Sequence, residues 1–329
     1  MSKQPGHQLN ATKVPRYAGY ATFLRAPIVE EAGDVDIGLI GVPVDHSATI
    51  RPGTRSAPSA VRDMSRFLHP INATTKVSPF ELVRIGDIGD APVNALDYEK
   101  TLELIEEHFR ILRDKHVVPV AIGGDHSVTL PILRGLFAGE RFGIVIFDSH
   151  HDCQPELLGS KVNHGTSARR LVEEGLVDPA RVIQVGLRGG YYSLAETKYG
   201  EELGIHQITM DQYEEMGRAR VIDRILEVLG DEPAYVSIDI DGVDPSQAPA
   251  TGLPEVGGLS VRDLQVILRS MTGRQIIGGD ICEVSPPLDV ANMTSIVAAN
   301  LMMELTCLAA VTRAQSASLP PVGPYIGGK

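Results

Sequence analysis

FGIVIFDSHHD, residues 142–152, joins an apolar run to a group of acidic and imidazole side chains. A short, continuous apolar run predicts a strand that is buried on both faces of a parallel sheet. Alternate residues of a strand share a face, so Asp148, His150 and Asp152 converge if the extended geometry persists beyond Phe147. Taken alone, the stretch fits a metal site and a polar knot about equally well, because loops after strands often carry Asp and His.

The rest of the chain repeats this strand pattern and alternates it with helical periodicity. Further strands are predicted at residues 36–44, 82–88, 117–122, 181–187, 204–209, 234–240 and 275–282. Helices are predicted to begin near Ser59 and to cover 98–116, 128–137, 167–174, 210–229, 261–271 and 291–311. Such alternation predicts an α/β protein, a three-layer α/β/α sandwich with a doubly wound, mostly parallel sheet.

One large domain is predicted over residues 35–311, because no shift in composition marks a linker inside it. Residues 1–34 are polar and contain Pro and Gly, which predicts an N-terminal arm packed on its own domain or on a neighbouring subunit. Residues 312–329 are predicted to form an irregular tail. A dinucleotide fingerprint of the GxGxxG type does not follow the first strand.

Composition excludes several classes of partner. The net charge of −12 argues against binding to nucleic acid and to an anionic membrane surface, both of which require a basic patch. The three cysteines, Cys153, Cys282 and Cys307, are too few and too scattered for a disulfide framework or a thiolate zinc site. The N-terminus lacks the apolar core of a signal peptide, so a cytoplasmic location is expected.

Four predicted strands end in polar side chains that can bind metal. His126 follows residues 117–122, Asp239 and Asp241 follow the strand at 234–240, and Glu283 follows the strand at 275–282. The carboxyl ends of parallel strands lie at one edge of a sheet, so these groups should meet Asp148, His150 and Asp152 there. Each Asp could instead cap a helix or a turn, but it is improbable that all of them do so at strand ends.

Two imidazoles and four carboxylates exceed what one tetrahedral zinc ion needs, and they suit two ions that share bridging Asp oxygens. Nitrogen and oxygen ligands without thiolate favour Mn²⁺, with Ni²⁺ or Co²⁺ as alternatives. Uncompensated, the clustered carboxylates would raise each other's pKa. Two ions about 4 Å apart would remove that repulsion and activate a shared water as hydroxide.

Five segments together resemble the arginase/agmatinase family of ureohydrolases, in order along the chain: GGDHS at 123–127, FDSHHD at 147–152, NHGT at 163–166, SIDIDGVDP at 237–245 and DICEVSPP at 280–287. The arm PRYAGYATFLRAP at 15–27 and RPGTR at 51–55 look closest to the agmatinase-like guanidino-acid hydrolases, of the guanidinobutyrase and guanidinopropionase type. The resemblance implies the doubly wound sandwich, a trimer or hexamer, and a binuclear manganese hydroxide that attacks a guanidinium carbon and releases urea and an amine.

The resemblance also implies roles for single residues. One ion would be held by His126, Asp148, Asp152 and Asp241 and the other by Asp148, His150, Asp239 and Asp241, with Asp148 and Asp241 bridging. His164 would shuttle a proton to the leaving amine, Glu283 would pair with the substrate guanidinium, and Asp152 would serve catalysis as well as ligation. Asp244, before Pro245, is expected to shape the turn or to orient a ligand.

Three departures from the family pattern affect the substrate more than the metal chemistry. Ser149 and His151 flank His150, and His151 is expected to point away from the site by strand alternation. The loop at 45–58 has an unusual composition for this family, and the contacts of the loop at 188–192 do not follow from the sequence.

The expected substrate is a small cationic guanidino compound, such as guanidinobutyrate, guanidinopropionate or agmatine. The alternative is an alkylated guanidine or a biguanide of the metformin type, cleaved with nickel. A homo-oligomer is the first expectation, and one subunit of a mixed oligomer is the alternative. Two other classes fit the sequence less well: a non-catalytic supporting subunit, which would have lost ligand positions, and a deacetylase-like hydrolase, which would need one metal and a Tyr acid.

Overall fold

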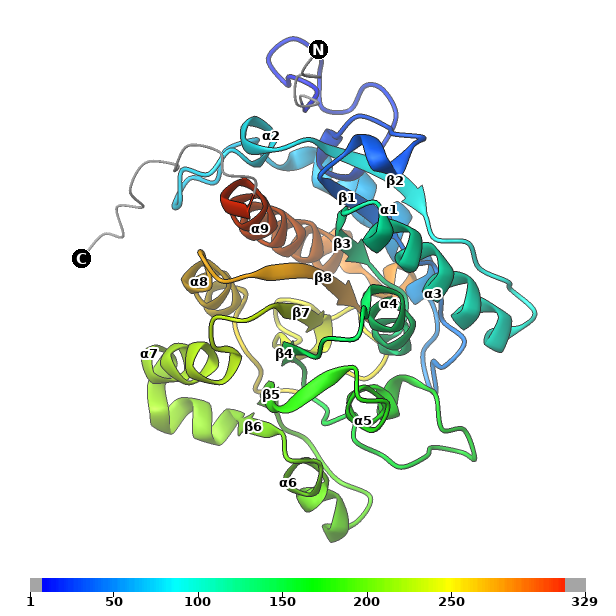
Figure 1. The fold of residues 1–329 in the computed structure, drawn as a ribbon, viewed down its shortest axis with the longest axis vertical. Coiled ribbons are helices and arrows are strands. Elements are labelled where there is room, and N and C mark those ends of the chain that lie inside the picture. Colours follow the sequence, from blue (N-terminus) through cyan, green and yellow to red (C-terminus); the bar gives the residue numbers. More distant parts are fainter. Residues whose placement is uncertain (1–7, 317–329) are drawn as a thin grey trace.

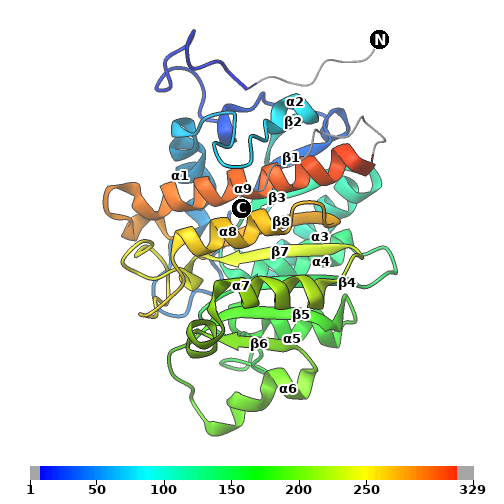
Figure 2. The same ribbon diagram turned by 90° about the vertical axis from the view of Figure 1, so that its left-hand side faces the viewer.

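The computed structural model describes residues 8–316 and shows one eight-stranded, all-parallel sheet within that range. The strand order is β2-β1-β3-β8-β7-β4-β5-β6, and every pairing between neighbours is parallel. Figure 2 shows the strands side by side and pointing in the same direction. The strands are β1 Ile37–Gly41, β2 Ile85–Asp90, β3 Val118–Ile122, β4 Phe142–Phe147, β5 Val177–Leu187, β6 His206–Thr209, β7 Ala234–Asp239 and β8 Ile276–Cys282.

Helices cover both faces of the sheet, so the predicted α/β/α sandwich is confirmed. Helices α7, α8 and α9 lie on one side of the strands, and α3, α4 and α5 lie on the other (Figure 1). The helices are α1 Ala57–Met64, α2 Pro79–Leu82, α3 Tyr98–Asp114, α4 Thr129–Leu136, α5 Ser167–Glu173, α6 Tyr199–Leu203, α7 Met210–Leu229, α8 Val261–Ser270 and α9 Met293–Ser316.

The central strands are buried on both faces because helices pack on each side. Every residue of β1, β4 and β7 is buried, as their continuous apolar sequences predict. Alternate side chains of each strand enter two separate apolar cores. Val145 and Phe147 pack in the core beneath α7, α8 and α9, whereas Ile144 and Ile146 pack in the core beneath α3, α4 and α5.

Several predicted boundaries are wrong, including the end of the strand at 36–44, which stops at Gly41, and the start of the strand at 181–187, which begins at Val177. The strand predicted at 82–88 is shifted, because Leu82 ends the short helix α2 and the strand begins at Ile85. The irregular tail predicted from residue 312 is helical as far as Ser316, since α9 runs on past Val311. The remainder of that tail, and residues 1–7 of the predicted arm, lie outside the described residues.

Helix α9 forms much of one core. A window within Val290–Gln315 is long and apolar enough to cross a membrane, but 89% of that window is buried inside the protein, as expected for the core helix of a globular fold. Its one buried acid, Glu304, is paired: Arg269 of α8 donates to both carboxylate oxygens, and the Asn72 amide donates to Oε2 at 2.9 Å.

Substitution of Arg269 by Met is expected to destabilise the fold by about 3 kcal/mol, because it leaves the Glu304 carboxylate buried without its cation. Chemical denaturation followed by circular dichroism measures this loss. The matched control is Arg110→Met, since Arg110 pairs with Glu107 on the exposed face of α3. Exposed pairs contribute little, so the control should unfold at the same denaturant concentration as the unmodified protein. Equal midpoints for both variants would contradict the assignment.

Candidate metal centre

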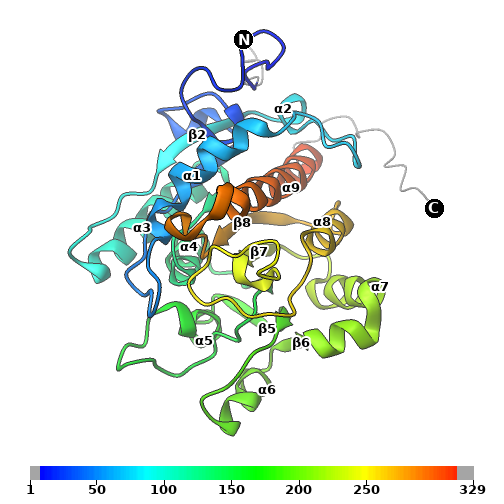
Figure 3. The same ribbon diagram turned by 180° about the vertical axis from the view of Figure 1, so that it is seen from behind.

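The adjacent strands β3, β8, β7 and β4 place polar residues together at their carboxyl ends. Figure 3 views the molecule from this side, where the loops after the strands gather around the yellow segment that follows β7. The structure brings all six sequence-predicted metal ligands, His164 and Glu283 to this edge; none of them lies elsewhere.

Close packing of backbone positions His126. The loop after β3 lies directly against the chain after β1, and the Asp125 N–H donates to the Val44 carbonyl at 3.0 Å. A Cβ atom on Gly124 would lie 1.7 Å from that same carbonyl oxygen, so only glycine permits this approach. Asp125 then caps the 3-10 turn His126–Val128 by accepting from the Ser127 N–H, and the His126 ring points into the strand-end site.

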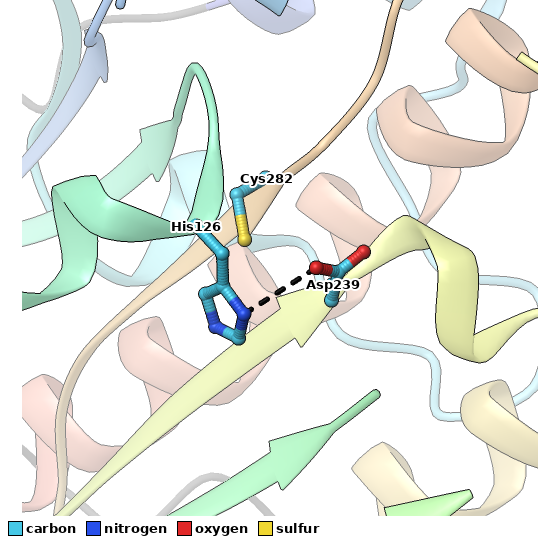
Figure 4. A group of neighbouring side chains, drawn as sticks. All are labelled: His126, Asp239 and Cys282. Carbon is cyan, nitrogen blue, oxygen red and sulfur yellow. Dashed lines mark ion pairs between the residues drawn. The ribbon is translucent and has the colours of Figure 1, made fainter. Parts of the chain in front are cut away.

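A first cluster surrounds one nitrogen of His126. Its Nδ1 lies 3.1 Å from Asp148 Oδ2, 3.0 Å from Asp152 Oδ2 and 3.3 Å from Asp239 Oδ2, and all four side chains are buried. Figure 4 shows His126 and Asp239 pointing toward one another. His126 Nδ1 and Asp148 Oδ2 are nevertheless buried without a hydrogen bond. Buried polar atoms that converge without bonding to each other fit a bound cation.

A second cluster consists of Asp148, His150 and Asp241. His150 Nδ1 lies 3.0 Å from Asp241 Oδ2 and 3.7 Å from Asp148 Oδ1. The two oxygens of Asp148 therefore face different clusters, which is the geometry that a bridging carboxylate requires. The donor sets of both clusters, nitrogen and carboxylate oxygen, fit divalent ions of the first transition row.

The grouping of ligands differs from the sequence expectation for two aspartates. Asp239 lies with His126, whereas it was expected beside His150. Asp241 lies with His150, and its Oδ1 accepts from the Ser149 N–H at 3.0 Å and the Ser149 hydroxyl at 2.7 Å. A bridging role for Asp241 stays a prediction.

Several of these aspartates also fix the local backbone. Asp148 Oδ1 accepts from the His150 N–H at 2.6 Å, and Asp239 Oδ1 accepts from the Asp241 N–H at 2.8 Å. In both residues this leaves Oδ2 directed at His126. Turn capping and metal binding are therefore compatible: Asp239 uses a different oxygen for each, and Asp148 Oδ1 both accepts from the His150 N–H and faces the second cluster.

Burial and mutual repulsion make this group of charges unfavourable without a cation. Burial, together with the charges of Asp152 and Asp241, raises the pKa of Asp148 to about 7. Burial and the charges of Asp241 and Asp148 raise the pKa of Asp239 well above its usual value. Two divalent cations would compensate these charges, so the residues present fit a binuclear centre.

The thiol of Cys282 belongs to the same neighbourhood and was missed from the sequence. Its Sγ, His126 and Asp239 offer ligand atoms within 4.8 Å of one another (Figure 4). The spacing of the three cysteines argues against a site made of thiols alone, but it does not address a single thiol beside other ligands. The sequence does contain a signal for Cys282, because this residue ends the strand β8 and directly precedes Glu283.

Two site residues adopt a left-handed backbone that is uncommon outside glycine. Asp152 has φ of 47° and Glu283 has φ of 61°. Such conformations typically cost about 1–3 kcal/mol and persist only where the surrounding structure imposes them. Here the strained positions coincide with a ligand of the first cluster and with the carboxylate beside His164.

Glu283 and His164 lie beside the metal ligands. Glu283 Oε1 accepts from the His126 N–H at 2.8 Å and lies 3.5 Å from His164 Nδ1. Burial lowers the pKa of His164, but the neighbouring Glu283 carboxylate outweighs this and raises the pKa to about 9. His164 is therefore held in its protonated, cationic form at neutral pH.

A cavity of about 600 Å³ opens above these residues. Its floor includes His150, Asp152, Asp239, Asp241, His164 and Glu283, and its walls come from the loops near residues 50, 157, 190 and 253. The loop at 45–58 reaches this cavity through Thr49 and Ile50, and it is fixed by Ser47, whose hydroxyl donates to Asp125 at 2.6 Å.

His151 turns away from both clusters. Its ring stacks on Tyr191 with centroids 5.7 Å apart, its Nδ1 accepts from the Cys153 N–H, and its Nε2 lies 3.6 Å from Glu196. Burial lowers its pKa, so it is a neutral side chain that supports the cavity wall. Tyr191 and Glu196 come from the segment after β5, so strand alternation could not reveal these contacts.

Asp244 shapes the turn after β7, which is one of the two roles expected from the sequence. Its carboxylate accepts from the backbone N–H groups of Ser246, Gly257 and Gly258, at 2.9, 2.8 and 3.0 Å. Hydrogen bonds from Ser246 and Gly258 hold the pKa of Asp244 well below its usual range.

Comparisons with known proteins give a consistent result. The sequence model of the arginase family matches residues 35–308. A guanidinopropionase of Pseudomonas aeruginosa is 41% identical over 96% of this chain and 100% of its own length, and a guanidinobutyrase of the same organism is 35% identical over 94% and 98%. The solved structure of proclavaminate amidino hydrolase from Streptomyces clavuligerus superposes with a TM-score of 0.85 at 34% identity, over 91% of this chain and 100% of that one.

Proposed function

Because the chain belongs to the arginase family, whose guanidino-compound hydrolases it matches over nearly its whole length, we propose that it is a binuclear metal-dependent amidinohydrolase. The proposed reaction hydrolyses a small guanidino compound to urea and an amine. The observation that supports it best is Asp148, whose two oxygens face two ligand clusters beneath a cavity that also contains Glu283 and His164.

The proposed reaction needs a nucleophile, alignment of the substrate and a proton for the leaving group, and residues of this chain can provide for each. A guanidinium carbon is a poor electrophile because resonance spreads its charge, so it needs a strong nucleophile and precise alignment. Two divalent cations, when bound, supply Lewis acidity and lower the pKa of water toward neutrality, so that hydroxide is available as the nucleophile. We propose Mn²⁺ as the ion, with Ni²⁺ as the alternative.

Glu283 aligns the substrate. Its Oε1 is already used by the His126 N–H, and no hydrogen bond among the described residues uses Oε2. A carboxylate oxygen at the cavity floor can accept N–H groups of a planar guanidinium, a charge-assisted interaction with defined direction. The reacting carbon is thereby held above the two ligand clusters.

His164 supplies a proton to the leaving amine. Its pKa of about 9 keeps an acid available at neutral pH, and Glu283 holds the ring in place. The proton on His164 Nδ1 or Nε2 would pass to the departing nitrogen as its bond to carbon breaks.

The pH dependence of activity follows from that pKa. His164 carries its proton below about pH 9 and loses it above, so kcat/KM should fall as pH rises through this range. His164→Asn should remove this limb and lower kcat about a hundredfold. The matched control is His116→Asn, at an exposed position outside the cavity that already has a positive φ, and its profile should match that of the unmodified protein. A limb that survives in His164→Asn would assign it to another group.

The direct test of the function is urea release across a panel of guanidino compounds by metal-stripped protein refilled with Mn²⁺ or Ni²⁺. Urea from at least one compound, dependent on added metal, is expected. No urea from any compound with either metal would refute the proposed reaction.

We also propose a homo-oligomer. The N-terminal arm exposes Tyr17 and Tyr20, at 84% and 88%, and the Tyr17 carbonyl accepts from Arg66, which precedes the half-exposed Phe67. Such aromatic surface commonly lies in contacts between subunits.

A further inference from the structure

The cavity wall above the candidate metal centre is apolar and aromatic. Leu157, Leu158, Tyr191, Tyr192 and Leu253 line it, on three separate loops. Tyr192 and Leu158 are mostly exposed, at 89% and 90%, so they form the mouth. A guanidinium held by Glu283 at the floor would direct the rest of the substrate toward these residues.

The ionisable groups of the cavity are mostly acidic. Asp152, Asp239, Asp241 and Glu283 lie at the floor, and Glu196 and Glu255 lie higher in the wall. Arg188 is the one Lys or Arg side chain among the described residues that line the cavity. Two divalent cations, this guanidinium and the protonated His164 balance the six carboxylates of the lining, so no excess positive charge is left in the cavity to attract an anionic substrate end.

Every N–H group of the Arg188 guanidinium donates to a backbone carbonyl. Its Nε donates to Glu255 O, its Nη1 to Gly186 O and Gly242 O, and its Nη2 to Asp241 O at 2.7 Å and again to Glu255 O at 2.8 Å. A Cβ atom on Gly258 would lie 2.5 Å from its Nη2, so the guanidinium is also enclosed sterically. Arg188 ties the loops after β5 and β7 together and has no N–H group left for a substrate carboxylate.

Arg51, the cationic side chain in the loop at 45–58 that follows Ile50, also donates to backbone carbonyls. Arg51 follows Ile50 but does not itself line the cavity. Its Nη2 donates to Thr251 O at 2.7 Å and its Nε to Gly252 O at 3.1 Å. Among the described residues that line the cavity, therefore, no lysine or arginine side chain has an N–H group free for an anionic substrate end.

The two wall acids differ in availability. Glu196 is buried, lies 3.6 Å from His151 Nε2 and accepts from Ser193 at 3.3 Å. The Glu255 carboxylate packs against Gly189, where a Cβ atom would lie 2.5 Å from Glu255 Cδ, and it has no hydrogen bond or ion pair with the described residues. Glu255 is therefore an anionic group at the mouth that is free to meet a substrate.

We propose, on the basis of the proposed function, that the substrate is a guanidine whose far end carries no carboxylate. The mouth selects an alkyl or a second cationic end: the leucine and tyrosine wall contacts the alkyl chain, and Glu255 favours a cation beyond it. This distinguishes the chain from its guanidinopropionase and guanidinobutyrase relatives, whose names specify guanidino acids.

The test compares three compounds that share a four-carbon chain and differ at its end. They are 4-guanidinobutyrate, n-butylguanidine and 4-aminobutylguanidine (agmatine), which end in a carboxylate, a methyl group and an amine. For the metal-loaded enzyme, kcat/KM for 4-guanidinobutyrate should be at least about tenfold below that for n-butylguanidine, and 4-aminobutylguanidine should be the best of the three.

The outcomes separate this proposal from the proposed function. Urea release with 4-guanidinobutyrate equal or preferred overturns the proposal and leaves the reaction class intact. A preference for n-butylguanidine over 4-aminobutylguanidine overturns the role of Glu255. Urea from none of the three, nor from the wider panel, refutes the function itself.

Two variants test the residues involved. Glu255→Gln should reduce the preference for 4-aminobutylguanidine over n-butylguanidine about fivefold or more. Tyr192→Arg places a cation in the mouth and should raise kcat/KM for 4-guanidinobutyrate relative to n-butylguanidine by a similar factor. Leu194→Arg is the control, because it adds the same charge on the same segment at an exposed position outside the cavity lining. An equal gain in Leu194→Arg would show that net charge, and not the mouth, sets the preference.

Discussion

Replacing Asp148 by Asn should abolish urea release and remove both metal ions. Its Oδ2 lies 3.1 Å from His126 Nδ1 in the first cluster, and its Oδ1 faces His150 in the second. An amide has one acceptor oxygen and no charge, so it cannot serve both clusters. Metal centres contribute several kcal/mol to transition-state stabilisation, and a loss of activity of at least about a thousandfold is expected.

Metal content of the purified variants, measured together with urea release, tests the two-cluster geometry. Asp241→Asn should lose the ion beside His150, because Asp241 contributes to the second cluster. Asp244→Asn is the control; it retains both ions, since Asp244 bonds to backbone N–H groups of the turn. Two ions bound to Asp148→Asn would contradict the shared role of Asp148, and none bound to Asp241→Asn would show that Asp241 bridges.

Glu283→Gln should lower kcat/KM by about a hundredfold or more while leaving the metal content unchanged. The variant keeps an oxygen for the His126 N–H but loses the charge that pairs with the guanidinium. Removal of one partner from a buried, charged hydrogen bond typically costs about 2–5 kcal/mol, which corresponds to this range. Steady-state kinetics with the best substrate of the panel measures it.

The pKa of His164, which lies beside Glu283, should also change in Glu283→Gln. The Glu283 carboxylate raises the pKa of His164, so the alkaline limb of the pH profile should shift to lower pH in Glu283→Gln. Glu232→Gln, at an exposed position in the turn before β7, is the matched control and should leave both the rate and the profile unchanged. A full-rate Glu283→Gln enzyme would exclude a role for this carboxylate in aligning the substrate.

Most of the fold followed from the sequence because its strands are buried on both faces. Continuous apolar runs such as FGIVIF mark such strands directly, and helix α3 was predicted from its start at Tyr98 to within two residues of its end. The short helices α2 and α6 were not predicted, since four or five residues are too few to show helical periodicity. The break in α7 at Gly217, where φ is 75°, also escaped prediction because an isolated glycine is tolerated in helices.

The meeting of the site residues could be predicted, but their pairing could not. Parallel strands bring their carboxyl ends to one edge, which is enough to gather His126, Asp148 and Asp241 from distant parts of the chain. The pairing depends on how the chain turns after each strand. Asp239 ends β7 and Asp241 lies in a 3-10 turn, so their carboxylates point to different clusters instead of sharing one face. That turn is stabilised by contacts that sequence spacing does not contain.

The left-handed backbone at Asp152 and Glu283 has a consequence for how this protein can evolve and be engineered. Glycine would relieve the strain at either position, so Asp152→Gly and Glu283→Gly remove an unfavourable backbone conformation together with a buried charge. Such variants are candidates for a more heat-resistant but inactive protein, the usual form of a stability–activity trade-off. A search for thermostable variants that does not also select for turnover would tend to enrich substitutions at these two positions.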